Sequence, residues 1–270
     1  MDHGRVGEGP TPPANPFPAW QRNDPVPISQ PRVFLTAEWR SLAMVNYVVD
    51  PAILAPFVPA GTELDEFHGK VFVSMVGFLF LKTRVCGVPF PWHQNFEEVN
   101  LRFYVRRRVP GESGWRRGAV FIREIVPKIV IATVARVLYN EPYLACPMRH
   151  RVTASADATE AVFDWRHAGR WHSLAVSAEG GEPLAIAPGS EEEFITEHYW
   201  GYNKQRDGGT MEYAVEHPRW RFWRGRDYRF DCDVASLYGQ AFVPFLTARA
   251  SSAFVAEGAP VQVRQGRRLR

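Results

Sequence analysis

Short runs of β-branched and aromatic residues, each bounded by turn-forming residues, recur along most of this chain. Beyond Met148 they follow one another at a spacing of roughly ten residues, which is typical of strands in a mainly-β domain. Such runs are predicted as strands because alternate side chains can face a core. The predicted strands are residues 32–49, 64–67, 71–81, 96–108, 118–126, 151–154, 161–166, 171–177, 210–216, 220–223 and 228–234.

Three short segments favour helix instead. Asp50 and Pro51 suit the cap and the first turn of a helix that the following prolines soon end. Ser190, followed by Glu193, is a capping-type pair that opens one further short helix. Residues 127–139 begin with proline and carry apolar residues at helical spacing, which predicts a helix. The β-branched run I-V-I-A-T-V within them is typical of strand, so this assignment has an alternative.

This pattern of many strands and few helices indicates a mainly-β domain of the α+β class, built as an antiparallel barrel or sandwich. A closed barrel also leaves no exposed sheet edge. Residues 1–30 are rich in Pro and Gly and poor in large aliphatic residues, so we expect a flexible arm. The folded domain is predicted to span residues 31–250. The basic tail, residues 251–270, is expected to be mobile.

The composition argues against several classes of protein. Hydrophobic residues make up 46% and charged residues 23%, as in an ordinary globular protein. A net charge of +3 is too small to argue for nucleic-acid binding. The three cysteines are widely spaced and form no C-x-x-C motif, which favours reduced thiols. No apolar run is long enough for a membrane span, and no signal-peptide core opens the chain. We therefore expect a soluble cytoplasmic protein without a membrane partner.

The histidines do not predict a metal site. His93, His150, His198 and His217 lie in different segments, and the motif H-E-x-x-H is absent. The chain also lacks a G-x-S-x-G elbow and a P-loop, so serine-hydrolase and nucleotide-phosphate chemistry have no support. We expect neither a metal nor another cofactor.

Charged residues within apolar runs mark the candidate site, because a buried charge is costly unless it is paired or used. Strand alternation places Glu98, Asn100 and Arg102 on one face of the strand predicted at 96–108. Glu98 either acts on a substrate or forms an ion pair with Arg102 or Arg123. Arg123 and Glu124 are adjacent on a strand, so only one of the two can point inward.

Several motifs resemble those of the uncharacterised YqjF-like family. They are F-E-E-V-N-L-R-F-Y-V, F-I-R-E-I-V-P-K, A-R-V-L-Y-N-E-P-Y with P-M-R-H-R, T-E-H-Y-W-G-Y and V-E-H-P-R-W. Together they cover roughly residues 31–245. This family is similar to the acetoacetate-decarboxylase-like superfamily, and the resemblance implies an antiparallel β-barrel with a few short helices around a pocket. It also makes a homo-oligomer an expectation.

Two shorter matches imply a catalytic pair. The Schiff-base lysine of acetoacetate decarboxylase lies in an R-E-x-x-x-P-K-K segment, which Arg123, Glu124, Pro127 and Lys128 resemble here. Its active-site glutamate occupies a position similar to that of Glu98. Ile129 stands where the decarboxylase has a second lysine. A neutral amine is needed for attack on a carbonyl, so without that second cation only burial or a helix N-terminus could lower the pKa of Lys128.

Two functions therefore remain open from the sequence. One is a lyase-like enzyme that acts on a small carbonyl or keto-acid substrate through Lys128 and Glu98. The other is a non-catalytic protein of the same fold that binds a small apolar or aromatic molecule. The candidate ligand-binding residues in either case are Arg123, Glu124, His93, Tyr199 and Tyr202. The basic run at 106–108 with the pair at 116–117 favours a solvated hairpin over a phosphate site.

Overall fold

The computed structural model describes residues 31–89, 92–128, 140 and 142–269. Pro31–Arg270 forms one compact unit. The strands are β1 (Val33–Val49), β2 (Glu63–Leu64), β3 (Val71–Val85), β4 (Val88–Pro89), β5 (Phe96–Arg108), β6 (Trp115–Val126), β7 (Tyr143–Ala145), β8 (Met148–Ala154), β9 (Ala158–His167), β10 (Arg170–Glu179), β11 (Leu184–Ala185), β12 (Trp200–Lys204), β13 (Thr210–Glu216), β14 (Arg221–Asp231), β15 (Ser252–Arg264) and β16 (Arg267–Arg268). The helices are η2 (Pro51–Ile53), η3 (Ala55–Phe57), α2 (Glu191–Thr196), α3 (Val234–Tyr238), η4 (Gln240–Phe242) and α4 (Val243–Leu246).

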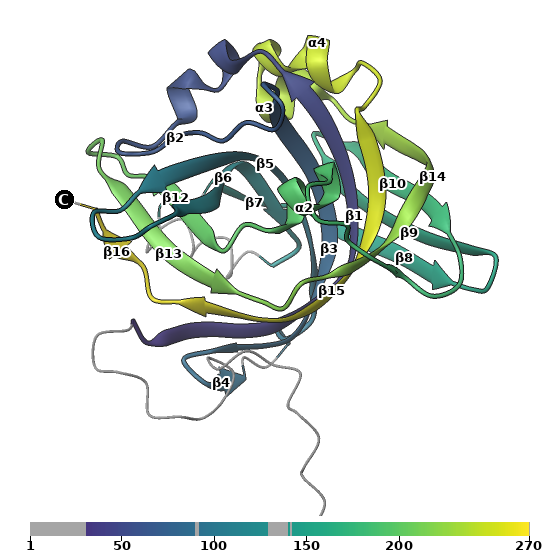
Figure 1. Ribbon diagram of the computed structural model, residues 1–270. Coiled ribbons are helices and arrows are strands. Elements are labelled where there is room, and N and C mark those ends of the chain that lie inside the picture. The colour runs from purple at the N-terminus through teal and green to yellow at the C-terminus, as the bar shows by residue number, and fades with distance from the viewer. Residues whose placement is uncertain (1–30, 90–91, 129–139, 141, 270) are drawn as a thin grey trace, which may run out of the picture. The chain divides into compact units, whose positions relative to one another are not determined.

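Seven of these strands form a ring, in the order β1, β3, β5, β6, β12, β13 and β15, and β15 pairs with β1 again (Figure 1). Six of the seven pairings are antiparallel, whereas β12 pairs with β6 in parallel. The prediction of a mainly-β, α+β domain is confirmed. The prediction of an antiparallel barrel is confirmed only as a ring of strands with one parallel pairing.

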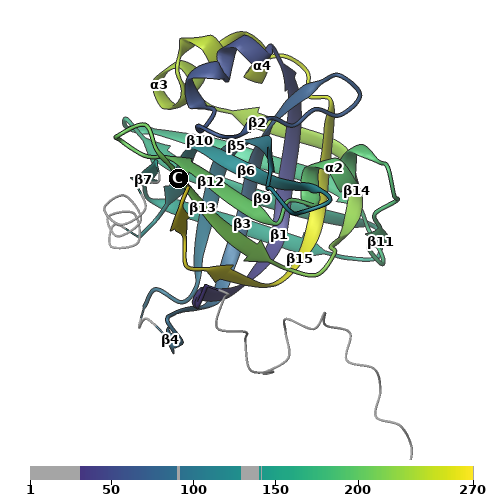
Figure 2. The ribbon, with the colours of Figure 1, turned by 60° about the vertical axis from the view of Figure 1, so that its left-hand side comes forward.

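A second layer of strands packs against the outside of the ring. The sheet continues from β15 through β14, β10 and β9 to β8 (Figure 2). Buried residues of β9 and β10, such as Phe163 and Leu174, share one core with Val45 and Met75 of the ring. Gly77 allows this close packing, because a Cβ atom there would lie 2.6 Å from the Phe163 ring. The other core includes the aromatic side chains Phe78, Phe80 and Phe96, which also line the space inside the ring.

The short helices form where their capping residues predicted them. The Asp50 side chain accepts a hydrogen bond of 2.8 Å from the amide of Ala52 and opens η2. The Ser190 hydroxyl accepts one of 3.1 Å from the amide of Glu193 and opens α2. Two helices that the sequence did not predict, α3 and α4, lie at the same end of the ring as η2 (Figure 1).

Four predictions about the ends of elements need correction or lie outside the described residues. The tail expected to be mobile from residue 251 is wrong for 252–264, because β15 pairs with β1, β13 and β14. The strands predicted at 220–223 and 228–234 are one strand, β14. Strand β12, residues 200–204, was not predicted from the sequence. The helix predicted at 127–139 falls almost entirely outside the described residues, as does the arm at 1–30.

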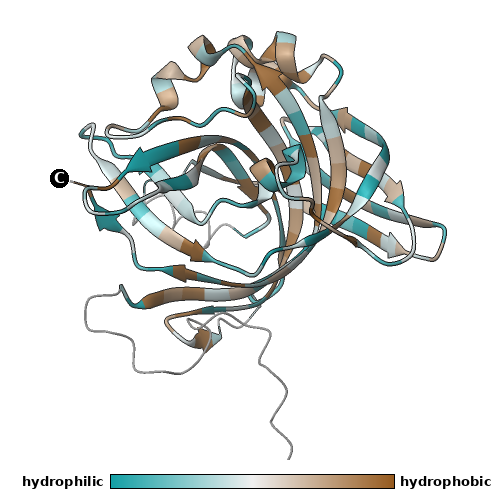
Figure 3. Cartoon of the chain, viewed as in Figure 1, coloured by the Kyte–Doolittle hydropathy of each residue, from teal (hydrophilic) through white to brown (hydrophobic). Residues whose placement is uncertain are grey.

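Hydrophobic segments follow the central strands, and hydrophilic ones gather near the β5–β6 turn and along β16 (Figure 3). Within the described part of the chain, no helix has the length and apolar character needed to cross a membrane.

Candidate functional site

The ring surrounds a cavity of about 340 Å³, which we call the ring cavity. All seven ring strands contribute to its lining. One wall is aromatic: Trp39 packs edge-on against Phe78 and Phe80 at centroid distances of 5.4 and 5.8 Å. Phe80 stacks in turn on Phe96 at 4.7 Å. A small cavity with an apolar wall and a few polar groups is typical of a site for a small organic ligand.

The polar part of the cavity lining comes mainly from one strand, β5. Glu98, Asn100 and Arg102 all line the cavity, and the exposed fraction of their side chains is small. The prediction that these three residues share one strand face is therefore confirmed. Glu124 of β6 also lines the cavity, opposite Asn100 in the strand register, whereas Arg123 does not line it. The strand places the acid inward and the arginine on the other side.

Arg102 is a buried cation without a carboxylate partner among the described residues. The residue is 9% exposed, and its one hydrogen bond runs from Nε to the Tyr104 hydroxyl at 3.4 Å. Its guanidinium also lies 5.7 Å from the centre of the Tyr104 ring. Arg264, which lines the same cavity, is instead held by Glu216 in two hydrogen bonds of 2.6 and 3.1 Å. Of these two arginines, Arg102 is the one that lacks an acidic partner among the described residues.

A chain of hydrogen bonds starts at Arg102 and holds its guanidinium in one orientation. The Tyr104 hydroxyl, which accepts from Arg102, lies 2.7 Å from Ser74 Oγ, and Ser74 donates to Asn46 Oδ1 at 2.6 Å. Because the Ser74 proton is used in this way, Tyr104 must donate to Ser74. Asn46 Nδ2 then donates to Ser252 Oγ at 2.9 Å, and Ser252 donates to the carboxylate of Glu191 at the start of α2. Each link from Arg102 to Glu191 therefore has one donor and one acceptor.

Glu98 accepts from two neighbours inside the cavity. Asn100 Nδ2 donates to Glu98 Oε1 at 2.9 Å, and the Tyr143 hydroxyl donates to Glu98 Oε2 at 3.2 Å. Neither Arg102 nor Arg123 forms an ion pair with Glu98. The alternative that Glu98 pairs with one of these arginines is therefore wrong. Glu98 itself faces the cavity.

His198 and His217 are buried next to the cavity as neutral rings. His198 stacks on Tyr104 at 4.3 Å, and its Nε2 lies 3.6 Å from Asp65 Oδ2. Burial lowers the pKa of His198 to about 4, against the opposing effect of Asp65. Burial likewise lowers the pKa of His217 to about 4. His217 is stacked between Tyr199 and Trp220, at 4.8 and 4.5 Å.

The other predicted site residues lie in different environments. His93 lines the cavity. Lys128 is half-buried just beyond the end of β6 and is not among the described residues that line the cavity. Tyr199 donates to Glu197 and contacts the cavity only through His217. Tyr202 points away from the cavity and donates to Glu212 Oε1 at 3.2 Å. The catalytic and binding roles assigned to these residues stay predictions.

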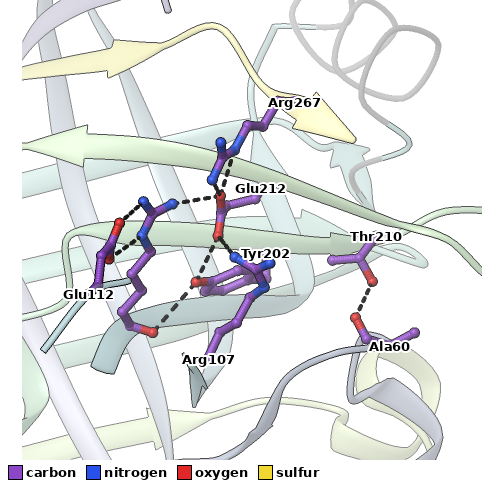
Figure 4. Close-up of polar contacts among 8 residues, drawn as sticks. Ala60, Arg107, Glu112, Tyr202, Thr210, Glu212 and Arg267 are labelled. Atoms are coloured by element: carbon purple, nitrogen blue, oxygen red, sulfur yellow. Dashed lines mark hydrogen bonds and ion pairs between the residues drawn. The ribbon is translucent and has the colours of Figure 1, made fainter. Parts of the chain in front are cut away.

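The basic hairpin between β5 and β6 is largely neutralised. Glu212 of β13 is completely buried and accepts hydrogen bonds from three arginines and from Tyr202 (Figure 4). The arginine donors are Arg107 at 3.1 Å, Arg116 at 2.9 Å and Arg267 at 2.8 Å. Acidic partners hold the arginines at 106 and 117 as well. This cluster ties the hairpin to β13 and offers little free charge to a phosphate.

No group of three His, Cys, Asp or Glu side chains in the described ranges is arranged to hold a metal ion. The described cysteines, Cys86, Cys146 and Cys232, are all unpaired.

Comparison with known proteins places the chain in a family. Residues 36–260 match the family DUF2071, described as an uncharacterized conserved protein. The chain belongs to this family. The uncharacterized protein YqjF of Bacillus subtilis (strain 168) is 25% identical over 181 residues, which are 67% of this chain and 72% of YqjF. The resemblance predicted from the sequence motifs is confirmed.

Solved structures show the same fold at low sequence identity. Acetoacetate decarboxylase from Legionella pneumophila is 13% identical, with a TM-score of 0.59 over 93% of both chains. The enduracididine biosynthesis enzyme MppR, complexed with pyruvate, is 15% identical, with a TM-score of 0.62 over 91% of this chain and 93% of MppR. At this identity the comparison shows an acetoacetate-decarboxylase-like fold for the DUF2071 protein, and the fold alone.

The sequence predicted that Glu98, Asn100 and Arg102 share one face of β5, but it did not predict the rest of the site. Arg102 was considered only as a partner for Glu98, and the chain behind it joins strands far apart in sequence. The signal available for Arg102 is its position two residues from Asn100, between the apolar residues Leu101 and Phe103. The aromatic wall follows from alternation in β3, where Phe78 and Phe80 point to the same side.

Proposed function

We propose that this protein binds a small carboxylic acid in the ring cavity, with the carboxylate on Arg102 and the apolar body against the aromatic wall. The observation that carries the proposal is the buried guanidinium of Arg102, which no acidic side chain of the described residues neutralises. The same geometry serves a binding protein and an enzyme, so the proposal concerns the class of ligand first.

Electrostatics supports a carboxylate as the missing partner. A buried charge without a counter-ion is strongly unfavourable, and completing the pair recovers much of that cost. A planar guanidinium binds a carboxylate through two parallel hydrogen bonds. The hydrogen bond to Tyr104 uses Nε, so it leaves the two terminal nitrogens of Arg102 for a ligand. These nitrogens are the ones that a carboxylate in the cavity would meet.

The size and walls of the cavity support an apolar body for that acid. A volume of about 340 Å³ is at the small end of ligand sites. The aromatic wall of Trp39, Phe78 and Phe80 favours a branched aliphatic or aromatic group through burial of apolar surface. The structural neighbour MppR, whose complex contains pyruvate, gives a precedent for a small carboxylate in this fold.

The proposal is tested with a matched pair of ligands in titration calorimetry. Isocaproate carries the carboxylate, and isocaproamide has nearly the same shape without the charge. We expect isocaproate to bind at least about tenfold more tightly, because a hydrogen bond to a charged group is worth about 1.5–3 kcal/mol. Equal affinity for the acid and the amide, or no binding of any small carboxylic acid, would contradict the proposal.

Covalent chemistry at Lys128 is a second function, favoured by the similarity of the segment 123–128 to the decarboxylase segment, although two residues and not three separate Glu124 from Pro127 here. Borohydride trapping with small keto acids, followed by mass spectrometry, tests it separately. Schiff-base chemistry predicts a stable adduct on Lys128 that is lost in the Lys128→Ala variant. The same labelling in wild type and in the variant would rule it out and would leave the binding proposal standing.

A further inference from the structure

We infer that the ring cavity selects acids that carry a hydrogen-bond donor, a hydroxyl or an ammonium group, on the carbon next to the carboxylate. This inference rests on the proposed binding of a carboxylic acid by Arg102. It comes from Asn100, which lies between Glu98 and Arg102 on the cavity face of β5.

The orientation of the Asn100 amide is fixed by its neighbour. A carboxylate accepts hydrogen bonds and donates none, so the group that faces Glu98 Oε1 at 2.9 Å must be the Asn100 NH₂. Asn100 Oδ1 therefore points to the other side. This oxygen is buried and has no hydrogen-bond partner among the described residues. An unsatisfied buried acceptor is rare in folded proteins and is commonly filled by a ligand or an ordered water.

The surroundings of Asn100 call for a donor and disfavour another acceptor. Glu98 lies beside it on β5, and Glu124 lies opposite it on β6. Both are carboxylic acids that line the same cavity. A keto oxygen placed here would face acceptor oxygens, whereas a hydroxyl or an ammonium group would donate to Asn100 Oδ1. Sites that hydrogen-bond a ligand hydroxyl discriminate strongly against analogues without it.

The spacing of Asn100 and Arg102 along β5 requires the donor of the ligand to lie close to its carboxylate. Asn100 and Arg102 are two residues apart on one strand, so their Cα atoms are about 7 Å apart and their side chains enter the cavity together. Arginine is long and asparagine is short, and the cavity is only about 340 Å³. A small molecule that meets both groups in this cavity needs its donor near its carboxylate, and the carbon next to the carboxylate is the position that we infer.

Four acids with one carbon skeleton test this in calorimetric titrations of the full chain. They are isocaproate, α-ketoisocaproate, both enantiomers of α-hydroxyisocaproate, and both enantiomers of leucine. We expect one enantiomer of the hydroxy acid or of the amino acid to bind at least about tenfold more tightly than both isocaproate and α-ketoisocaproate. Comparison of the hydroxy acid with leucine then identifies the donor as hydroxyl or ammonium.

The Asn100→Leu variant supplies the second measurement, because leucine has the same branched arrangement of side-chain heavy atoms as asparagine and no acceptor. In the variant, the ratio of the affinity for the donor-bearing acid to the affinity for isocaproate should fall to about one. A single cooperative transition in chemical denaturation shows that the variant is folded. If isocaproate or the keto acid binds as tightly as the hydroxy and amino acids in the wild type, the inference is overturned while the carboxylate proposal stands. If none of the four acids binds, the carboxylate proposal itself fails.

Discussion

The Nε atom of Arg102 donates a hydrogen bond of 3.4 Å to the hydroxyl of Tyr104. The bond is long, yet it makes Arg102 the first donor of a chain that continues through Ser74 and Asn46 to the carboxylate of Glu191. Tyr104 also stacks on His198, so one aromatic ring supports both polar groups on this side of the cavity. The position of the guanidinium depends on residues that never touch a ligand.

Replacing Tyr104 with phenylalanine should weaken ligand binding without removing any group of the cavity lining. The Tyr104→Phe variant leaves Arg102 Nε without its acceptor and Ser74 Oγ without its donor. We expect a several-fold loss of affinity for isocaproate and a loss of about 1–3 kcal/mol in the free energy of unfolding. Calorimetry and chemical denaturation measure the two effects.

The matched control is Tyr202→Phe, which removes another buried hydroxyl that donates to Glu212. It should lower the stability to a similar degree and leave the affinity for isocaproate unchanged, because Tyr202 does not line the cavity. A weaker affinity in Tyr202→Phe, together with unchanged affinity in Tyr104→Phe, would show that the orienting chain has been misassigned.

The buried histidines should make the protein less stable in mild acid. His198 and His217 have pKa values lowered by burial from 6.5 to about 4. Below pH 6.5 these two imidazoles bind protons in the unfolded chain but not in the folded state, so acid favours unfolding. Each histidine should lower the free energy of unfolding by on the order of 3 kcal/mol between pH 6.5 and pH 4, a window set by the two pKa values.

Denaturant titrations across that pH range measure this slope. The His198→Phe variant retains a ring to stack on Tyr104 and should show a flatter dependence on pH. His68→Gln, at an exposed position, should leave the slope as it is in the wild type. An unchanged slope in His198→Phe would mean that His198 is not held neutral by burial.

Removing the charge of Glu212 should destabilise the domain strongly. The carboxylate is completely buried, and the Glu212→Gln variant would leave Arg107, Arg116 and Arg267 around a neutral amide. Breaking a buried ion pair costs about 3–5 kcal/mol. Glu112→Gln, which removes a partly exposed partner of Arg116, should cost less than about 1 kcal/mol. Similar denaturation midpoints for the two variants would contradict this view of the cluster.

The sequence alone predicted those strands and helices that are marked by an alternating pattern or by a capping residue. Alternation over 96–108 and the cap at Asp50 are such signals, and both predictions match the structure. The strand β15 was missed because its sequence, which contains Gly258 and Pro260, weakens the strand pattern. Pairing with β1 along its whole length stabilises β15, although its local sequence favours a strand only weakly.

The candidate site was harder to predict, because its residues meet only through tertiary structure. Strand alternation correctly placed Glu98, Asn100 and Arg102 on one face, yet it could not show which charges find partners. That distinction depends on Glu216 reaching Arg264 and on no acid reaching Arg102 among the described residues. Pairing across strands distant in sequence leaves no periodic signal in a single chain.

The central claim, that Arg102 receives a ligand carboxylate, is tested most directly by isocaproate titration of the Arg102→Met variant. Methionine keeps much of the apolar side-chain stem and removes the charge. The control is Arg108→Met, because Arg108 is exposed and packs on Trp115 at the hairpin, away from the cavity. We predict that Arg102→Met loses about 10- to 100-fold in affinity for isocaproate and little for isocaproamide, whereas Arg108→Met binds as the wild type does. Wild-type affinity for isocaproate in a folded Arg102→Met protein would contradict the account.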